Sequence, residues 1–168
     1  GPTPEITEWV LDLLKAENIK AIFFCLGKNV TAHPEIYERI VSEGHTVGNH
    51  SNTHVNGWYA DNEYYFHDIN ECQKIVNAKF FRPPYGRIKK SQIKELVKDY
   101  KIIMWDVLSG DFDLKTTPEK CLNNVLKNTK SGSVIVFHDS EKATPNLKYA
   151  LPKAIEQLKE KGFVFEKL

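Results

Sequence analysis

The sequence has few cysteines, no run of one charge sign and no long apolar stretch, and each lack argues against a class of protein. Its 3 cysteines are widely spaced and form no C-x-x-C pair, which argues against a disulfide framework and against a cysteine zinc site. The 23 basic residues are balanced by 22 acidic ones and form no cluster, so we expect no nucleic-acid partner. Because no apolar stretch approaches the length of a membrane span, we expect no span either.

Short apolar runs instead alternate with amphipathic stretches along the chain. The spacing predicts helices over 3–18, 33–44, 61–78, 89–100, 117–132 and 146–162, and strands over 20–27, 45–50, 79–86, 101–107, 133–140 and 163–168. Thr3 and Thr117 are the expected N-caps, each followed by a proline. Strict alternation of strand and helix predicts an α/β fold with a parallel sheet, open or closed into a barrel. Without a repeat or a linker, we predict a single domain over 1–168.

Two histidines, His50 and His54, lie four positions apart directly after a predicted strand. This spacing lets both rings face one point if the residues between them form a helical turn, and neutral imidazole is a good zinc ligand. The pair is therefore a candidate metal site, a weak signal by spacing alone that its place after a strand strengthens. Surface or core positions are expected for His33, His45 and His67.

The segment F-R-P-P-Y-G over 81–86 predicts a rigid turn, because its two prolines fix φ and remove two N–H donors. Such a turn presents Arg82 on one side and the Tyr85 backbone on the other. One interpretation is purely structural, with Gly86 relaxing the backbone. The other is a loop that holds the arginine against a carboxylate and aims an N–H at a substrate oxygen.

Two more polar clusters follow strands: Asp106 and Asp111 in M-W-D-V-L-S-G-D-F, and His138 with Asp139 after V-I-V-F. Ligands bind at the carboxyl ends of strands in α/β folds, so four clusters at four such ends suggest one site. A histidine there is well placed for proton transfer, and an aspartate on its second nitrogen would fix its tautomer and raise its pKa. Taken singly, each cluster is better explained by loop residues that stabilise their own turn. Taken together and in this order, the clusters favour an active site.

In this order, the motifs resemble those of the NodB-homology polysaccharide deacetylases, carbohydrate esterase family 4, over nearly the whole chain. Residues 1–14 resemble the sequence that follows the family's first motif, T-F-D-D-G-P. Residues 43–54 are similar to the second motif, H-[ST]-x-x-H, and 81–86 to the third. Residues 105–112 and 135–140 are similar to the fourth and fifth. The resemblance implies a distorted (β/α) barrel whose first strand is missing from this chain.

The resemblance also implies metal-dependent removal of N-acetyl groups from N-acetylglucosamine units of chitin-like or peptidoglycan polymers. It assigns His50 and His54 to a divalent metal, usually Zn²⁺ and otherwise Co²⁺, Mn²⁺ or Ni²⁺, together with one aspartate. It assigns the Tyr85 backbone N–H to the oxyanion, with Pro84 beside it among the substrate-binding residues. Because such polymers lie outside the membrane, an extracellular or envelope location is expected.

The remaining roles are implied by the fourth and fifth motifs. His138 would protonate the leaving amine. Asp111 would orient the His138 ring and favour its charged form. Arg82 would hold the catalytic base, and Val136 and Phe112 would line the pocket for the acetyl methyl group. Leu108 stands where many members have aspartate, and Phe112 where many have tryptophan, so altered pocket detail is expected.

One departure bears on activity: the two aspartates of the first motif, base and third metal ligand, belong immediately before Gly1. Either the N-terminal segment is absent from this sequence or the protein never had the base. As given, the chain is expected to be impaired, because lost general-base assistance removes roughly 10²–10⁴-fold in rate. Sheet edges exposed by the missing strand would favour an unstable, associating chain.

Two other functions stay open on the same fold. One is a non-catalytic carbohydrate-binding module, and the other is a metal-dependent amidohydrolase acting on a small amide. Short loops favour an open groove for a polymer over a closed pocket. Trp58 and Tyr59, just past the histidines, form either a sugar-stacking wall or part of the core.

Overall fold

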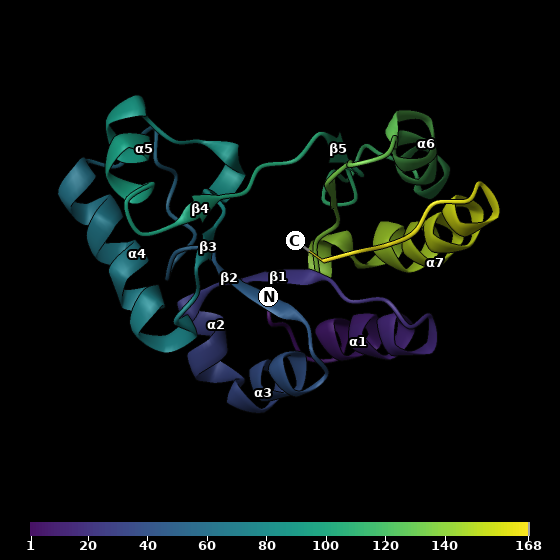
Figure 1. The fold of residues 1–168 in the computed structure, drawn as a ribbon, viewed down its shortest axis with the longest axis horizontal. Helices are drawn as coiled ribbons and strands as arrows, with labels where there is room; N and C mark the ends of the chain where they lie inside the picture. The colour runs from purple at the N-terminus through teal and green to yellow at the C-terminus, as the bar shows by residue number, and fades with distance from the viewer. Residues whose placement is uncertain (168) are drawn as a thin grey trace. The chain divides into compact units, whose positions relative to one another are not determined.

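The computed structural model describes residues 1–167 and has the alternating α/β pattern that the spacing predicts (Figure 1). Its helices are α1 (Ile6–Ala16), α2 (Gly27–Ala32), α3 (Pro34–Ser42), α4 (Asn62–Val76), α5 (Lys90–Leu96), α6 (Pro118–Asn128) and α7 (Thr144–Glu160). Its strands are β1 (Ile22–Cys25), β2 (Thr46–Asn49), β3 (Phe80–Phe81), β4 (Lys101–Ile102), β5 (Val107–Leu108) and β6 (Ile135–Val136). Short 3₁₀ turns are η1 (Pro84–Gly86) and η2 (Glu141–Ala143). Within 1–167, no helix is both long and apolar enough to cross a membrane.

The described residues divide into two compact units, and the single domain over 1–168 stays a prediction. The first unit comprises residues 1–2, 20–104 and 167, and it contains a parallel sheet in the order β1-β2-β3-β4. β1 and β2 pair along all four residues of each strand. A Cβ at Gly48 would lie 2.5 Å from the Phe24 ring, so this close pairing needs the glycine. β1 and β4 are the sheet's edge strands, and association through such an edge stays a prediction.

The helix α4 covers the core of the first unit. It begins where expected, because the Asp61 carboxylate accepts a hydrogen bond from the Tyr64 N–H at 2.9 Å. Its apolar positions 65, 69, 72 and 76 fall on one face and are all buried. This face packs into a cluster of buried residues, Tyr65, Ile69, Phe81, Leu96 and Tyr100. The helix that the 61–78 periodicity predicts is thereby confirmed, two residues shorter at its C-terminal end.

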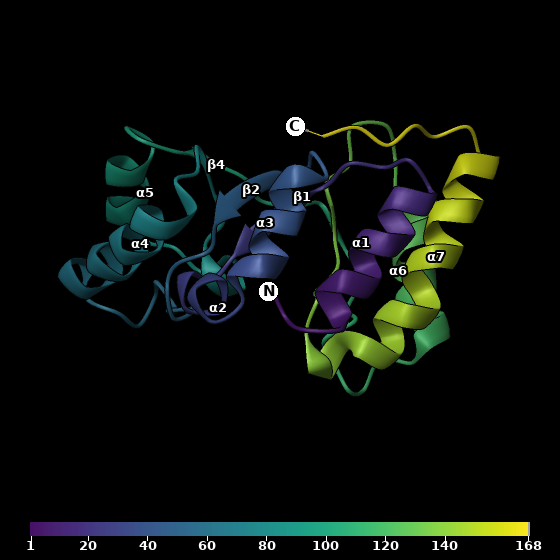
Figure 2. The same ribbon diagram turned by 90° about the horizontal axis from the view of Figure 1, so that it is seen from below.

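The second unit, residues 3–19 and 105–166, contains the parallel pair β5-β6 and three helices, α1, α6 and α7. Figure 2 shows α6 and α7 side by side, and their buried faces meet in a core of Val107, Val125, Ala154 and Leu158. Thr117 caps α6 as predicted, since its hydroxyl accepts from the Lys120 N–H at 3.2 Å. The helix nevertheless ends at Asn128, short of Gly132.

Two expectations from local pattern are wrong in this unit. α1 begins at Ile6 with Glu5, not Thr3, at its N-cap: the Glu5 N–H donates to the Glu8 carboxylate, and the Thr3 N–H donates to the Thr7 hydroxyl. The strand expected over 163–168 does not form in 163–167, and Leu168 lies outside the described residues. Phe163 and Phe165 pack on the core from an irregular segment, so their alternation reflects side-chain packing and not strand pairing.

The other predicted strands exist but are shorter than their apolar runs. Residues 79–86 pair only at Phe80–Phe81, because the two prolines that follow have no N–H for a ladder and lead into the turn η1. The run 101–107 does not form one strand: its first two residues form β4, and its last residue begins β5. No pattern in the sequence predicts α2, which begins at Gly27 directly after β1.

Candidate active site

The first candidate pair is His50 and His54, which follow β2 in the first unit. The His50 Nδ1 lies 2.7 Å from the Arg82 carbonyl oxygen, which can only accept, so Nδ1 carries the proton and Nε2 the lone pair. Burial, together with the neighbouring His54, lowers the pKa of His50 to about 3, so its ring is neutral at physiological pH. The two ring centroids lie 5.0 Å apart in an edge-to-face arrangement. The structure thus brings together the two imidazoles that the motif predicts.

The residues between the histidines do not form the helical turn through which this spacing could bring the rings together. Ser51 and His54 have φ values of 65° and 66°, in the left-handed region. Side chains bind the local N–H groups: the Asn49 Oδ1 accepts from the Ser51 N–H at 2.8 Å, and the Ser51 Oγ accepts from the N–H of His54 at 3.0 Å. Because these side chains replace helical hydrogen bonds, the rings meet through a looped conformation instead.

Asp68 on α4 fixes this loop from the other side, and the sequence analysis missed it. Its carboxylate accepts from the N–H of Asn52 at 2.9 Å, from the N–H of Thr53 at 3.1 Å and from the Thr53 hydroxyl at 2.8 Å. The side chain is buried, with only 4% of the residue exposed. A carboxylate on the apolar face of α4, beside Tyr65 and Ile69, is the signal that would have revealed it.

Replacing Asp68 by alanine is expected to loosen the His50–His54 loop and to destabilise the protein. The three donors in the loop lose a charged acceptor, which costs about 2 kcal/mol in the free energy of unfolding. If the histidines bind Zn²⁺, its affinity should fall roughly 10–100-fold, as for other groups that orient ligands. Urea unfolding and zinc titration measure the two effects. Glu63→Ala, on the exposed side of the same helix, should change neither; equal effects from both variants would contradict the role of Asp68.

The R-P-P-Y-G turn lies against the histidine pair. Tyr85 has a φ of 59°, and its ring centroid lies 4.4 Å from that of His54. The turn's own hydrogen bonds use the N–H groups of Gly86 and Arg87, donated to Pro83 and Pro84, so the Tyr85 N–H is not one of their donors. The contact places the Tyr85 ring beside a candidate ligand, and the oxyanion role of its backbone N–H stays a prediction.

Arg82 is held rigidly between β3 and this turn. Its Nε donates to the Ile103 carbonyl at 3.0 Å and its Nη2 to the Met104 carbonyl at 3.3 Å, while its guanidinium carbon lies 4.1 Å from the centre of the Phe24 ring. Burial lowers the pKa of Arg82 to about 10, so it is charged at neutral pH. That it holds a catalytic base stays a prediction.

The second candidate pair, Asp111 and His138, lies in the second unit. Asp111 is 1% exposed, and both of its carboxylate oxygens contact His138: Oδ1 lies 2.7 Å from Nδ1, and Oδ2 accepts from the backbone N–H at 2.6 Å. The carboxylate therefore fixes the proton on Nδ1 and leaves Nε2 as the reactive nitrogen. Phe112 packs edge-on against His138, with 5.0 Å between the two ring centroids. The buried Val136 lies in β6, two residues before His138.

Asn146 on α7 positions this pair and was also missed. Its Nδ2 donates to the carbonyls of Asp111 and Thr116, at 3.1 and 3.0 Å, and so secures the loop that carries the carboxylate. By contrast, the other two aspartates of the fourth and fifth motifs bind elsewhere. The Asp139 carboxylate accepts from the Thr7 hydroxyl, and that of Asp106 accepts from Ser133 and Val134, which lowers the Asp106 pKa.

A divalent metal fits the His50–His54 pair in chemistry but not in number of ligands. The His50 ring is neutral, with its Nδ1 proton bound to a carbonyl, which is the usual state of a metal-binding histidine. Catalytic zinc sites use three protein ligands. Within residues 1–167, no group of three or more His, Cys, Asp or Glu side chains is arranged to hold a metal ion.

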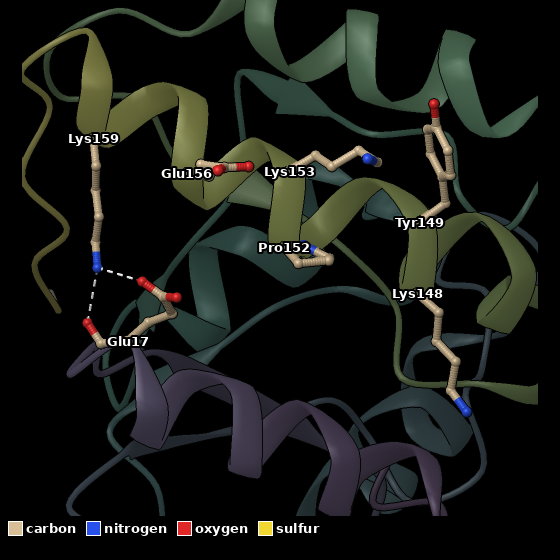
Figure 3. A pocket seen from close by; sticks show the side chains of 7 residues that line it. All are labelled: Glu17, Lys148, Tyr149, Pro152, Lys153, Glu156 and Lys159. Carbon is tan, nitrogen blue, oxygen red and sulfur yellow. Dashed lines mark hydrogen bonds and ion pairs between the residues drawn. The ribbon is translucent and has the colours of Figure 1, made fainter.

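An open hollow of about 610 Å³ lies in the second unit, along α7 (Figure 3). Its lining consists of Glu17, Lys148, Tyr149, Pro152, Lys153, Glu156 and Lys159. Lys159 crosses it to donate to the Glu17 carboxylate at 2.6 Å and to the Glu17 carbonyl at 2.9 Å. None of the candidate site residues lines this hollow, so we do not include it in the site.

Comparison with known proteins places these motifs in a family. A family model described as polysaccharide deacetylase matches residues 1–103. A peptidoglycan-N-acetylglucosamine deacetylase of Bacillus cereus is 38% identical over an alignment of 177 positions, which covers 98% of this chain. The chain spans 62% of that relative's length.

Solved structures show the same fold. The crystal structure of the Bc1960 peptidoglycan N-acetylglucosamine deacetylase, in complex with 4-naphthalen-1-yl-N-oxidanyl-benzamide, matches with a TM-score of 0.94 and 38% identity; the match covers 100% of this chain and 82% of that one. A carbohydrate esterase family 4 pseudoenzyme from Bacillus anthracis matches with a TM-score of 0.87 and 25% identity, over 98% of this chain and 59% of that one. The fold that the resemblance implies is thereby confirmed, whereas closure into a barrel stays a prediction.

Proposed function

Because the chain belongs to the polysaccharide deacetylase family, we propose that it hydrolyses N-acetyl groups of N-acetylglucosamine units in peptidoglycan or a chitin-like polymer. The reaction uses a divalent metal, Zn²⁺ or another ion such as Co²⁺, Mn²⁺ or Ni²⁺. The observation that carries this proposal is the His50–His54 pair, neutral at His50 and in contact with the R-P-P-Y-G turn. The polymer substrate implies action outside the cell membrane, in the envelope or beyond it.

In the proposed reaction, water adds to the acetamide carbon and the C–N bond breaks, which gives acetate and a free amine. His50 and His54 would hold a divalent metal, which would polarise the acetamide carbonyl and lower the pKa of the attacking water. The backbone N–H of Tyr85 donates to the carbonyl oxygen as negative charge develops on it, and His138 gives a proton to the leaving nitrogen from Nε2. Asp111 keeps the Nδ1 proton of His138 in place throughout.

Four more residues shape the site in this proposal. Arg82, charged and held by two carbonyls, orients the carboxylate that acts as base. Pro84 is buried and stiffens the turn before Tyr85. Phe112, packed on the His138 ring, and Val136 enclose the acetyl methyl group. The 168-residue chain on its own is expected to be slow, because within its described residues no three metal-binding side chains come together.

Acetate release from N-acetylglucosamine tetramer and from peptidoglycan tests the proposal. We expect release that stops after chelation and returns with added Zn²⁺. Release from a small N-acetylated amine, but from neither polymer, would instead support an amidohydrolase for small amides. The assay should be run on this chain and on an N-terminally extended one.

A non-catalytic carbohydrate-binding module is the second candidate function. Two observations favour it: no three-ligand metal cluster exists within residues 1–167, and one structure with the same fold is a pseudoenzyme. This function predicts saccharide binding that is unchanged by a chelator, without acetate release from either form of the chain. Calorimetric titration with the tetramer, with and without chelator, separates the two candidates.

A further inference from the structure

The loop of residues 56–60, just past His54, carries two exposed aromatic side chains. Trp58 is 50% exposed and Tyr59 is 86% exposed. Large aromatic side chains gain most from being covered, so two adjacent ones in solvent indicate a surface that something contacts. The sequence left open whether they belong to the core, and their exposure excludes that interpretation.

This loop is fixed by the segment 87–92, so the exposure does not come from an irregular, unpacked chain. The buried Gln92 donates from its amide to the Gly57 carbonyl at 3.0 Å, and the Lys89 Nζ donates to the Ala60 carbonyl at 2.6 Å. Gly57 itself has no room for a side chain, because a Cβ there would lie 2.6 Å from the Arg87 carbonyl oxygen. The loop is thus a prearranged support for the aromatic residues.

The indole of Trp58 is held in one orientation. Its Nε1–H donates to the Ile88 carbonyl at 3.3 Å, and the Arg87 guanidinium carbon lies 4.0 Å from the ring centre. The N–H is therefore already used, and the arginine covers part of the ring. What Trp58 offers to solvent is aromatic surface and not a hydrogen-bond donor.

The exposed surface of Trp58 lies in the same unit as the candidate metal pair, and two side-chain contacts connect it to that pair. The Tyr85 ring packs on His54, and Arg87, two residues later, packs on Trp58. Two residues span at most about 7 Å between their Cα atoms. The histidine pair and the exposed indole are therefore joined by one short segment, the R-P-P-Y-G turn and its continuation.

We propose that Trp58, with Tyr59 beside it in the loop, is a stacking site for a sugar ring of the polymer, next to the sugar whose N-acetyl group is hydrolysed. This inference rests on the proposed function and adds a second subsite to it. The C–H face of a pyranose is apolar and slightly positive, which suits the negative face of an aromatic ring. Two side chains in one loop are small for a protein interface, which buries about 800 Å² per partner, but match a single sugar ring.

Calorimetric titration with N-acetylglucosamine and its tetramer tests this subsite, with chelator present so that binding is measured without turnover. The unmodified chain should bind the tetramer at least about 10-fold more tightly than the monosaccharide. Trp58→Leu, which keeps apolar bulk without an aromatic ring, should weaken tetramer binding about 10-fold. Trp58→Phe, which keeps a ring, should stay within about 3-fold. Monosaccharide affinity should be the same in all three, and melting curves confirm that each is folded.

The control is Tyr64→Leu, which removes a side chain that is 49% exposed on α4 and should leave tetramer affinity unchanged. Three results would overturn the subsite. The unmodified chain could bind monosaccharide and tetramer with equal affinity. Tetramer affinity could fall equally in Trp58→Leu and Trp58→Phe, or as much in Tyr64→Leu as in Trp58→Leu. A Trp58-dependent preference for the tetramer in a chain that releases no acetate would support the subsite while rejecting the proposed hydrolysis. If only a protein ligand depended on Trp58, the sugar site would be wrong.

Discussion

A chain extended in front of Gly1 by a segment that carries T-F-D-D is expected to release acetate from N-acetylglucosamine oligomers roughly 10²–10⁴-fold faster than the 168-residue chain. The resemblance assigns one of these aspartates to the base and the other to the metal. Two imidazoles alone leave a catalytic metal one protein ligand short of the usual three. The extension supplies that ligand and the base together.

The structure gives a physical reason why such a segment would reach the histidines. The Gly1 carbonyl accepts a hydrogen bond from the Leu26 N–H, at the end of β1, at 3.0 Å. The carbonyl of Cys25, the residue before Leu26, accepts from the His50 N–H at 3.0 Å, so Gly1 and His50 both bind the end of β1. Residues added before Gly1 therefore start beside the candidate metal pair.

Two variants of the extended chain make this test specific. Each of the two added aspartates is replaced in turn by asparagine, which keeps size and removes the charge. Loss of bound Zn²⁺ should follow one replacement, and loss of rate with Zn²⁺ still bound should follow the other. Full activity in the 168-residue chain, or no gain from the extension, would contradict the assignment.

Replacing Asp111 by asparagine in the extended chain is expected to lower kcat by roughly 10²–10⁴-fold with little change in KM. The carboxylate is buried and uses both oxygens on His138, so an amide must point an N–H at one of its two donors. The tautomer of His138 is then no longer held with its proton on Nδ1, and proton delivery from Nε2 fails. We expect a cost of about 1–3 kcal/mol in unfolding free energy as well.

The matched control is Asp113→Asn in the same loop. Its carboxylate is exposed and accepts from the nearby Lys115 N–H, so kcat should stay within about 2-fold of the unmodified enzyme, as expected for an exposed surface position. Zn²⁺ affinity, measured by titration, should be unchanged in both variants, because neither carboxylate belongs to the His50–His54 pair. A drop in kcat that merely tracks the fraction unfolded would make Asp111 a structural residue only.

Local sequence signals were reliable where a structure depends on residues a few positions apart. α6 begins at the Thr117–Pro118 cap and α4 at Asp61, because a cap and a helical stripe involve neighbours within one or two turns. The same reasoning failed at α1, because the Thr7 hydroxyl that alters its start is bonded to Asp139, 132 positions away. It failed again at 163–167, where packing on a distant core produced the alternation of a strand without its pairing.

The sequence by itself identified the candidate site residues, since the ordered motifs contain the His50–His54 pair, the R-P-P-Y-G turn, Asp111 and His138. Only the tertiary structure decided how they are presented. The looped path from His50 to His54 and its support by Asp68 depend on hydrogen bonds from α4, and Asp111 depends on Asn146 of α7. Motifs are read along the chain, whereas buried carboxylates and left-handed backbone are stabilised by partners that folding brings from elsewhere.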